Sequence, residues 1–129
     1  MSTQKTISDI YFIFTTEFSN VADRFIIKQL TFEQAETSYD PDVARGGVYV
    51  WWKDDRVYKV GRSLENSRKR ALEHIRDNTG EKMAGLKNDP GTRLILFNIK
   101  NKGNLHWVIA LEDFFEQKLE PVIQVKRRG

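Results

Sequence analysis

Two residues of one predicted helix, Arg70 and His74, have the types and the spacing that suit phosphate recognition. On a helix over residues 66–78, side chains four residues apart lie together on one face, here with Ser67 and Asp77. A guanidinium offers a planar fork of hydrogen-bond donors, and the imidazole beside it adds a second polar group. The same spacing also fits an ordinary solvated helix face, and the pair alone does not choose between these interpretations.

A carboxylate on a later predicted helix, Glu112, is the second group that could do chemistry. A helix over residues 104–120 places Glu112 in the middle of an arc of five apolar side chains: Leu105, Val108, Ile109, Phe115 and Leu119. A carboxylate there is buried at a cost in free energy, paired with a cation or bound to a metal, unless it reaches solvent past its neighbours. Glu116 lies near the same arc and is the competing candidate.

The composition restricts the metal that such a carboxylate could hold. The chain has no cysteine and two histidines, His74 and His106. Thiolate zinc sites and multi-histidine sites are therefore excluded. A metal would be held mainly by oxygen ligands, which favours Mg²⁺ or Mn²⁺.

The elements that must position these groups follow one another from Gly46 onward. Two runs rich in Val, Tyr and Trp, residues 48–52 and 56–60, flank a polar turn at residues 53–55 and predict a β-hairpin. The helix with Arg70 and His74 comes next. Residues 92–99 predict a third strand, which precedes the helix that carries Glu112.

Residues 1–45 precede the hairpin and predict an accessory extension packed on residues 46–129. Residues 9–15 form an apolar run that fits a strand or a buried helix. Ser19 is expected to begin a helix that runs through Leu30. Thr31 and Gln34 have the spacing of a capping box, so a second short helix is expected to start there.

The charge of the chain is distributed unevenly. Its net charge is +3, but residues 1–45 carry −3 and residues 46–129 carry +6. A basic region of this kind suits a polyanion as partner, and it equally suits a solvated surface. The basic side chains that we expect to contact a nucleic-acid backbone are Arg62, Arg68, Lys69, Lys82, Lys87 and residues 126–128.

The hairpin carries two short motifs that resemble those of the GIY-YIG nuclease family. Gly47-Val48-Tyr49 is similar to the Gly-Ile-Tyr motif on the first strand of that family. Lys59-Val60-Gly61 is similar to the Tyr-Ile-Gly motif on its second strand, with Lys in the place of the usual Tyr.

The two helices extend the resemblance in the right order along the chain. Arg70 and His74 match the Arg and His of the family's next helix, and Glu112 matches the Glu of its final helix. The family's following Asn would fall near Gln124, which is a second departure. The resemblance covers Gly46 to about Gln124 and leaves residues 1–45 outside it.

The resemblance implies an α/β fold with a small, mainly antiparallel three-stranded sheet flanked by helices. It also implies an endonuclease that hydrolyses DNA with one divalent metal, Mg²⁺ or Mn²⁺. Tyr49 would act as the base or position the water, and Lys59 would be the neighbour that adjusts its proton affinity. Arg70 would bind the scissile phosphate, His74 would support Tyr49 or the phosphate, and Glu112 would hold the metal.

Two alternatives to the enzyme remain open from the sequence. One is a nucleic-acid-binding module that keeps the fold and does not cut. The other is a subunit that depends on a second copy or a protein partner, with residues 1–45 as the docking surface. No apolar run approaches the roughly 20 residues of a membrane span, and no secretory signal is recognisable, so we expect a cytoplasmic protein of a prokaryotic or phage-infected cell.

Overall fold

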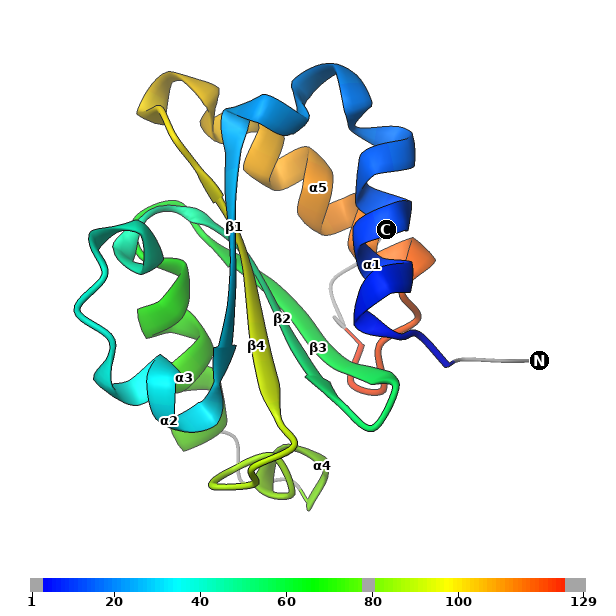
Figure 1. The fold of residues 1–129 in the computed structure, drawn as a ribbon, viewed down its shortest axis with the longest axis vertical. Helices are drawn as coiled ribbons and strands as arrows, with labels where there is room; N and C mark the ends of the chain where they lie inside the picture. The colour runs from blue at the N-terminus through cyan, green and yellow to red at the C-terminus, as the bar shows by residue number, and fades with distance from the viewer. Residues whose placement is uncertain (1–3, 78–80, 125–129) are drawn as a thin grey trace.

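The computed structural model of the chain describes residues 4–77 and 81–124, without the side chains of residues 81 and 82. Four strands form one antiparallel sheet in the order β1-β4-β2-β3 (Figure 1). They are β1 (Phe25–Thr31), β2 (Gly47–Lys53), β3 (Arg56–Ser63) and β4 (Arg93–Ile99). The α/β class and the antiparallel sheet agree with the prediction, but the sheet has four strands where three were expected.

The additional strand is β1, which replaces the helix expected to run from Ser19 through Leu30. A 3-10 helix, η1 (Ser19–Arg24), comes first, and β1 then pairs with β4 along its whole length, from Phe25 opposite Ile99 to Thr31 opposite Arg93. The run of Phe and Ile at its start favours a strand, and pairing with a distant segment overrides a local helical pattern. The expected helix at this position was therefore wrong.

Thr31 ends β1 and begins the next helix as predicted. Its side chain accepts a hydrogen bond from the backbone of Gln34, and the Gln34 side chain accepts one from the Thr31 backbone. This capping box starts α2 (Phe32–Thr37), and η2 (Pro41–Ala44) follows before β2.

The β2–β3 hairpin forms where its sequence predicts it. Asp54 and Asp55 have φ angles of 50° and 59° and make a two-residue turn, whose left-handed residues match the twist of the flanking strands. The register shifts between Trp51, which lies opposite Lys59, and Trp52, which lies opposite Val57. This irregularity increases the local twist of the hairpin.

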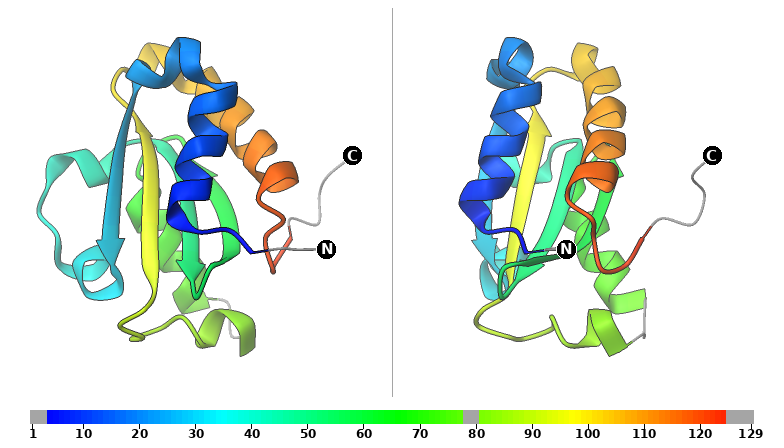
Figure 2. Two further views of the ribbon diagram at one scale, coloured as in Figure 1. Left: turned by 45° about the vertical axis from the view of Figure 1, so that its right-hand side comes forward. Right: turned by 90° about the vertical axis from the view of Figure 1, so that its right-hand side faces the viewer.

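Helices cover both faces of the sheet (Figures 1 and 2). One face is covered by α1 (Ile7–Glu17), which contains the ambiguous run of residues 9–15, and by α5 (Leu105–Lys118), which η3 (Lys102–Asn104) precedes. The other face is covered by α2, by α3 (Ser67–Asp77) and by α4 (Glu81–Ala84). The first core includes Ile10, Phe14, Val48, Val60, Phe97, Leu111 and Phe115. The second includes Leu30, Phe32, Tyr49, Trp51, Ala71, Ile75 and Leu96.

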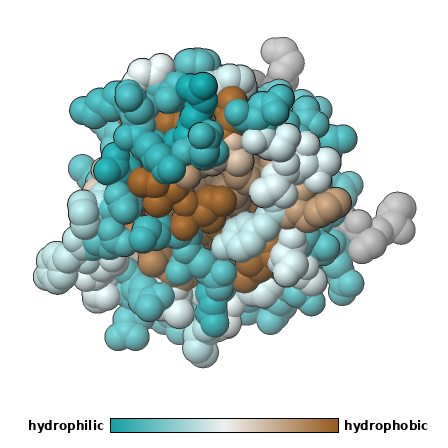
Figure 3. All heavy atoms as spheres, turned by 45° about the horizontal axis from the view of Figure 1, so that its top comes forward, coloured by the Kyte–Doolittle hydropathy of each residue, from teal (hydrophilic) through white to brown (hydrophobic). Residues whose placement is uncertain are grey.

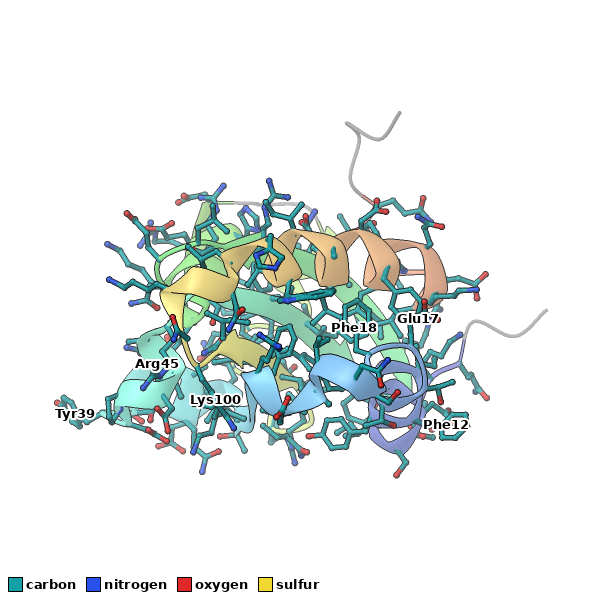
Figure 4. All side chains as sticks on the ribbon, turned by 90° about the horizontal axis from the view of Figure 1, so that it is seen from above. Phe12, Glu17, Phe18, Tyr39, Arg45 and Lys100 are labelled. Atoms are coloured by element: carbon teal, nitrogen blue, oxygen red, sulfur yellow. The ribbon has the colours of Figure 1, made fainter. Side chains whose placement is uncertain are left out.

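Aromatic contacts connect α1 to α5. Seen from above, Phe18 points between these two helices (Figure 4), and its ring centre lies 5.4 Å from that of Phe114 and 6.4 Å from that of Trp107. Figure 3 shows apolar side chains gathered at the centre of this side of the molecule, with polar ones around them. The position of α5 therefore depends on residues of the N-terminal segment.

Among the helices of the part of the chain described here, none has the length and apolar character to cross a membrane.

Candidate active site

The ring of Tyr49 crosses from β2 over the neighbouring strand β3. Tyr49 lies opposite Gly61 in the register of the two strands and is fully buried. A Cβ atom built on Gly61 would lie 2.3 Å from both Cζ and the phenol oxygen of Tyr49. Only a residue without a side chain leaves this space. Because β3 is the last strand of the sheet, Gly61 lets the phenol approach the sheet's outer edge.

His74 meets the phenol from α3. The Tyr49 oxygen is hydrogen-bonded to Nδ1 of His74, and the two ring centres lie 5.5 Å apart. Burial lowers the pKa of His74 below its usual range, and the negative charges of Asp77 and Glu112 oppose that shift. A neutral imidazole has a lone pair on one nitrogen, and in the tautomer with its proton on Nε2 the Nδ1 atom accepts from the phenol. Phenol and imidazole together can pass a proton along the pair.

Arg70 lies one turn before His74 on the same face of α3. Its Nη1 atom lies 3.3 Å from Oε1 of Glu73, and the side chain is about half exposed. An exposed ion pair within one helix contributes little free energy and is easily exchanged. The guanidinium is therefore available to an incoming anion at this edge.

Lys59 lies two positions before Gly61 on β3, on the same face of the sheet as Tyr49. Lys59 lies opposite Trp51 in the register of the two strands, so it is a diagonal neighbour of Tyr49 across the hairpin. Within the described residues its amine makes neither an ion pair nor a hydrogen bond, and His74 is the residue that contacts the phenol. The structure thus brings His74, and not Lys59, to the position of the phenol's neighbour.

Glu112 reaches the same edge from the opposite face of the sheet. It lies on α5, and its carboxylate forms an ion pair with Arg62 of β3. Its charge also acts on His74 across the edge. Three members of the expected apolar arc, Val108, Phe115 and Leu119, are buried, whereas Ile109 is 47% exposed. Glu112 lies among the buried residues of α5 with its side chain 16% exposed, and it is paired with a cation, one of the alternatives expected for a carboxylate in this place.

The competing carboxylate, Glu116, is buried, with 7% of its surface exposed. It lies one turn after Glu112 on α5. The carboxylate that pairs with Arg62 at the edge of the sheet is that of Glu112.

The groups at this edge could hold a divalent cation only together with ligands from water and the substrate. No three acidic or histidine side chains gather at one point in residues 4–77 and 81–124. Mg²⁺ commonly keeps several waters and is bound by one or two carboxylates together with substrate phosphates. Glu112 fits such a role as the single protein carboxylate, provided that its contact with Arg62 is exchanged.

A buried amide fixes the start of α3 and hence the positions of Arg70 and His74. Asn98 of β4 lies opposite Gly47, is fully buried, and accepts a hydrogen bond from the Ser67 hydroxyl at the first residue of α3. Its amide nitrogen donates to the carbonyl of Asp42 at 2.8 Å. A Cβ on Gly47 would lie 2.2 Å from the Asn98 side-chain oxygen, so this glycine makes room for the amide.

Sequence reasoning missed this anchor. Ser67 was expected on the exposed face with His74, but it is fully buried. The signal that could have found the anchor is an amide within an otherwise apolar strand, since a buried polar side chain needs a partner.

The other basic residues of the prediction are spread over the molecule. Arg68 donates to the carbonyl of Ala35 at 2.8 Å and holds α2 against α3, away from the phenol. Lys69, on α3, and Lys87, after α4, are exposed. The side chain of Lys82 and residues 126–128 lie outside the described residues. Among the members whose side chains the structure describes, Arg62 is the one that contacts the candidate site.

A surface hollow of about 400 Å³ lies elsewhere, beside the start of α2. Its lining residues are Thr31, Phe32, Glu33, Glu36, Asn88, Asp89 and Pro90. Three carboxylates in this set repel a phosphate, so the hollow does not fit a nucleic-acid backbone.

Comparison of the chain with protein-family models, with curated proteins and with solved structures found no match.

Proposed function

We propose that the protein is a metal-dependent DNA endonuclease of the GIY-YIG type. The observation that carries this proposal is the contact of the Tyr49 phenol with a neutral His74, next to Arg70 and within electrostatic reach of Glu112. A proton acceptor, a cationic phosphate ligand and a carboxylate are the three kinds of group that phosphodiester hydrolysis needs. Three different elements, β2, α3 and α5, supply them.

The proton of the attacking water would pass to the Tyr49 oxygen while the phenol proton passes to Nδ1 of His74. The neutral state of His74 supports this direction, because a protonated imidazole has no lone pair to offer. Arg70 would hold a non-bridging oxygen of the phosphate through its forked donors. A divalent cation bound at Glu112 would stabilise the charge that develops on the leaving oxygen.

The direct test measures cleavage of supercoiled, branched and single-stranded DNA with Mg²⁺ or Mn²⁺, and with EDTA. The wild type should cut at least one form in a metal-dependent manner. Glu112→Gln removes the charge that attracts the metal and keeps the shape, so cleavage should collapse while DNA binding survives. The matched control is Asp113→Asn, which makes the same charge change at the exposed next residue of α5.

The competing function is a nucleic-acid-binding module with the same fold, and the Arg62–Glu112 ion pair favours it. A carboxylate neutralised by arginine can serve structure alone. In that case no DNA form is cut, and Glu112→Gln and wild type bind DNA alike. Binding should still weaken with salt, with a slope of about −0.9 for each duplex phosphate contacted. Binding that does not respond to salt would point instead to a protein partner.

A further inference from the structure

Arg62 and Glu112 face each other across the outer edge of the sheet. Arg62 follows Gly61 on β3 and lies opposite Val48, whose side chain belongs to the core under α5. Strand alternation therefore directs Arg62 to the α5 face, away from the face of Tyr49. Its guanidinium meets the Glu112 carboxylate there, with side chains that are 39% and 16% exposed. The pair is accessible to solvent from the arginine side.

A cation that binds Glu112 meets this arginine as a competitor. The carboxylate of Glu112 contacts Arg62 and acts electrostatically on His74, as does that of Asp77, and no cluster of three possible ligands forms within the described residues. A divalent cation and a guanidinium use the same oxygen lone pairs, and each neutralises the charge that attracts the other. Metal binding must therefore weaken or break the Arg62–Glu112 contact.

We propose that Arg62 is an exchangeable counter-ion, which holds Glu112 in the free protein and is transferred to a DNA phosphate when a divalent cation takes the carboxylate. The exchange keeps every charge paired. Before it, the Glu112 carboxylate pairs with Arg62, and after it the carboxylate pairs with the metal and Arg62 pairs with a DNA phosphate. Arg62 directly follows Gly61 on β3, so the released guanidinium stays at the outer edge of the sheet, which the Tyr49 phenol approaches from the other face. Arg62 thereby acts as a positioning residue, and it couples metal binding to DNA binding.

The metal half of this proposal stands independently of DNA cleavage, and the DNA half rests on the proposed function. Coupling between two ligands is reciprocal, so the factor by which metal tightens DNA binding equals the factor by which DNA tightens metal binding. Removal of Arg62 should abolish most of that factor, because Arg62 is the group that the metal displaces and that the DNA phosphate then binds.

The test titrates the full chain with Mn²⁺ alone and measures free Mn²⁺ by electron paramagnetic resonance. Arg62→Gln should bind Mn²⁺ more tightly than wild type, by roughly two- to fivefold, the range expected for loss of a competing ion pair at a partly exposed site. Arg62→Lys should restore the weaker binding, and Glu112→Gln should abolish the site. Arg56→Gln is the matched control, because Arg56 is an exposed arginine of the same strand without a carboxylate partner among the described pairs.

The second measurement is the fluorescence anisotropy of labelled duplex in the Tyr49→Phe background, which prevents turnover under the proposed function. Mn²⁺ should tighten DNA binding in this background and should lose that effect when Arg62→Gln is added. Mn²⁺ affinity that is unchanged or weaker in Arg62→Gln, or undetectable in both proteins, overturns the exchange. If the protein cleaves DNA but Mn²⁺ does not tighten DNA binding, the proposed nuclease function stands and the proposed exchange of Arg62 is wrong. If Mn²⁺ tightens DNA binding but no DNA form is cleaved, the nuclease function is wrong and the metal half of the exchange stands.

Discussion

The ring of Tyr49 lies against the α-carbon of Gly61, its partner on the neighbouring strand. This packing makes the last glycine of the second motif a part of the site, because any side chain there would occupy the place of the phenol. It also explains why a fully buried tyrosine can have its oxygen at the edge of the sheet, in contact with His74.

Gly61→Ala should displace the phenol and destabilise the fold. The added methyl group would lie 2.3 Å from Cζ and from the phenol oxygen of Tyr49, and overpacking of this kind costs about 1–3 kcal/mol in the free energy of unfolding. Urea unfolding measures the loss, and in a Tyr49→Ala background the same substitution should cost much less. Gly103→Ala, at an exposed position of η3, is the control. Equal costs in the two backgrounds would contradict the contact.

Tyr49→Phe should separate chemistry from binding. The ring still fills its place over Gly61, but the group that would take the water's proton is gone, so cleavage should fall by about 10²- to 10⁴-fold. The lost hydrogen bond to His74 should cost about 1 kcal/mol in the free energy of unfolding. DNA affinity, measured by anisotropy, should change little. Tyr58→Phe, on the half-buried Tyr58 of β3, is the matched control.

Local patterns predicted most of the elements. The hairpin follows from the turn at Asp54 and Asp55, whose residue type tolerates left-handed backbone. The capping box at Thr31 was recognisable because both of its partners lie within four residues. Helical periodicity likewise indicated α3 and α5, and the apolar run of residues 92–99 indicated β4.

Long-range pairing decided what local patterns could not. Phe25 to Leu30 fits a helix as well as a strand, and its pairing with β4, about seventy residues later, makes it β1. The site follows the same rule. The four-residue spacing of Arg70 and His74 places them one turn apart on α3, but Tyr49–His74 and Arg62–Glu112 contacts join residues 25 and 50 positions apart. Such contacts depend on how the helices pack on the sheet.

Asn98→Ala should loosen the start of α3 and lower activity at a distance. The substitution leaves the Ser67 hydroxyl and the Asp42 carbonyl without their buried partner, which costs about 1–3 kcal/mol in the free energy of unfolding. Cleavage should fall because Arg70 and His74 are no longer held in place. Chemical denaturation and single-turnover rates measure the two effects, and the exposed Asn20→Ala is the control. A stable variant with full activity would exclude the anchor.

The pH dependence of the protein should carry the signature of His74. Burial holds the pKa of His74 below its ordinary value, so the folded protein resists protonation where the unfolded chain accepts a proton. The unfolded state then binds more protons, and the free energy of unfolding falls as the pH drops below roughly 6.5 and through the folded pKa. Cleavage should fall over the same acidic range, because a protonated imidazole no longer accepts the phenol proton.

His74→Gln isolates this contribution. Wild type and variant are compared by urea unfolding at several pH values between about 7.5 and 5, where the histidine titrates. The variant should lose less stability on acidification than wild type, whereas His106→Gln, at an exposed position of α5, should follow wild type. Parallel pH curves for wild type and His74→Gln would mean that the imidazole is not held neutral by the fold. The proton transfer from Tyr49 to His74 would then have no acceptor, and the nuclease proposal would have to assign the water's proton to another group.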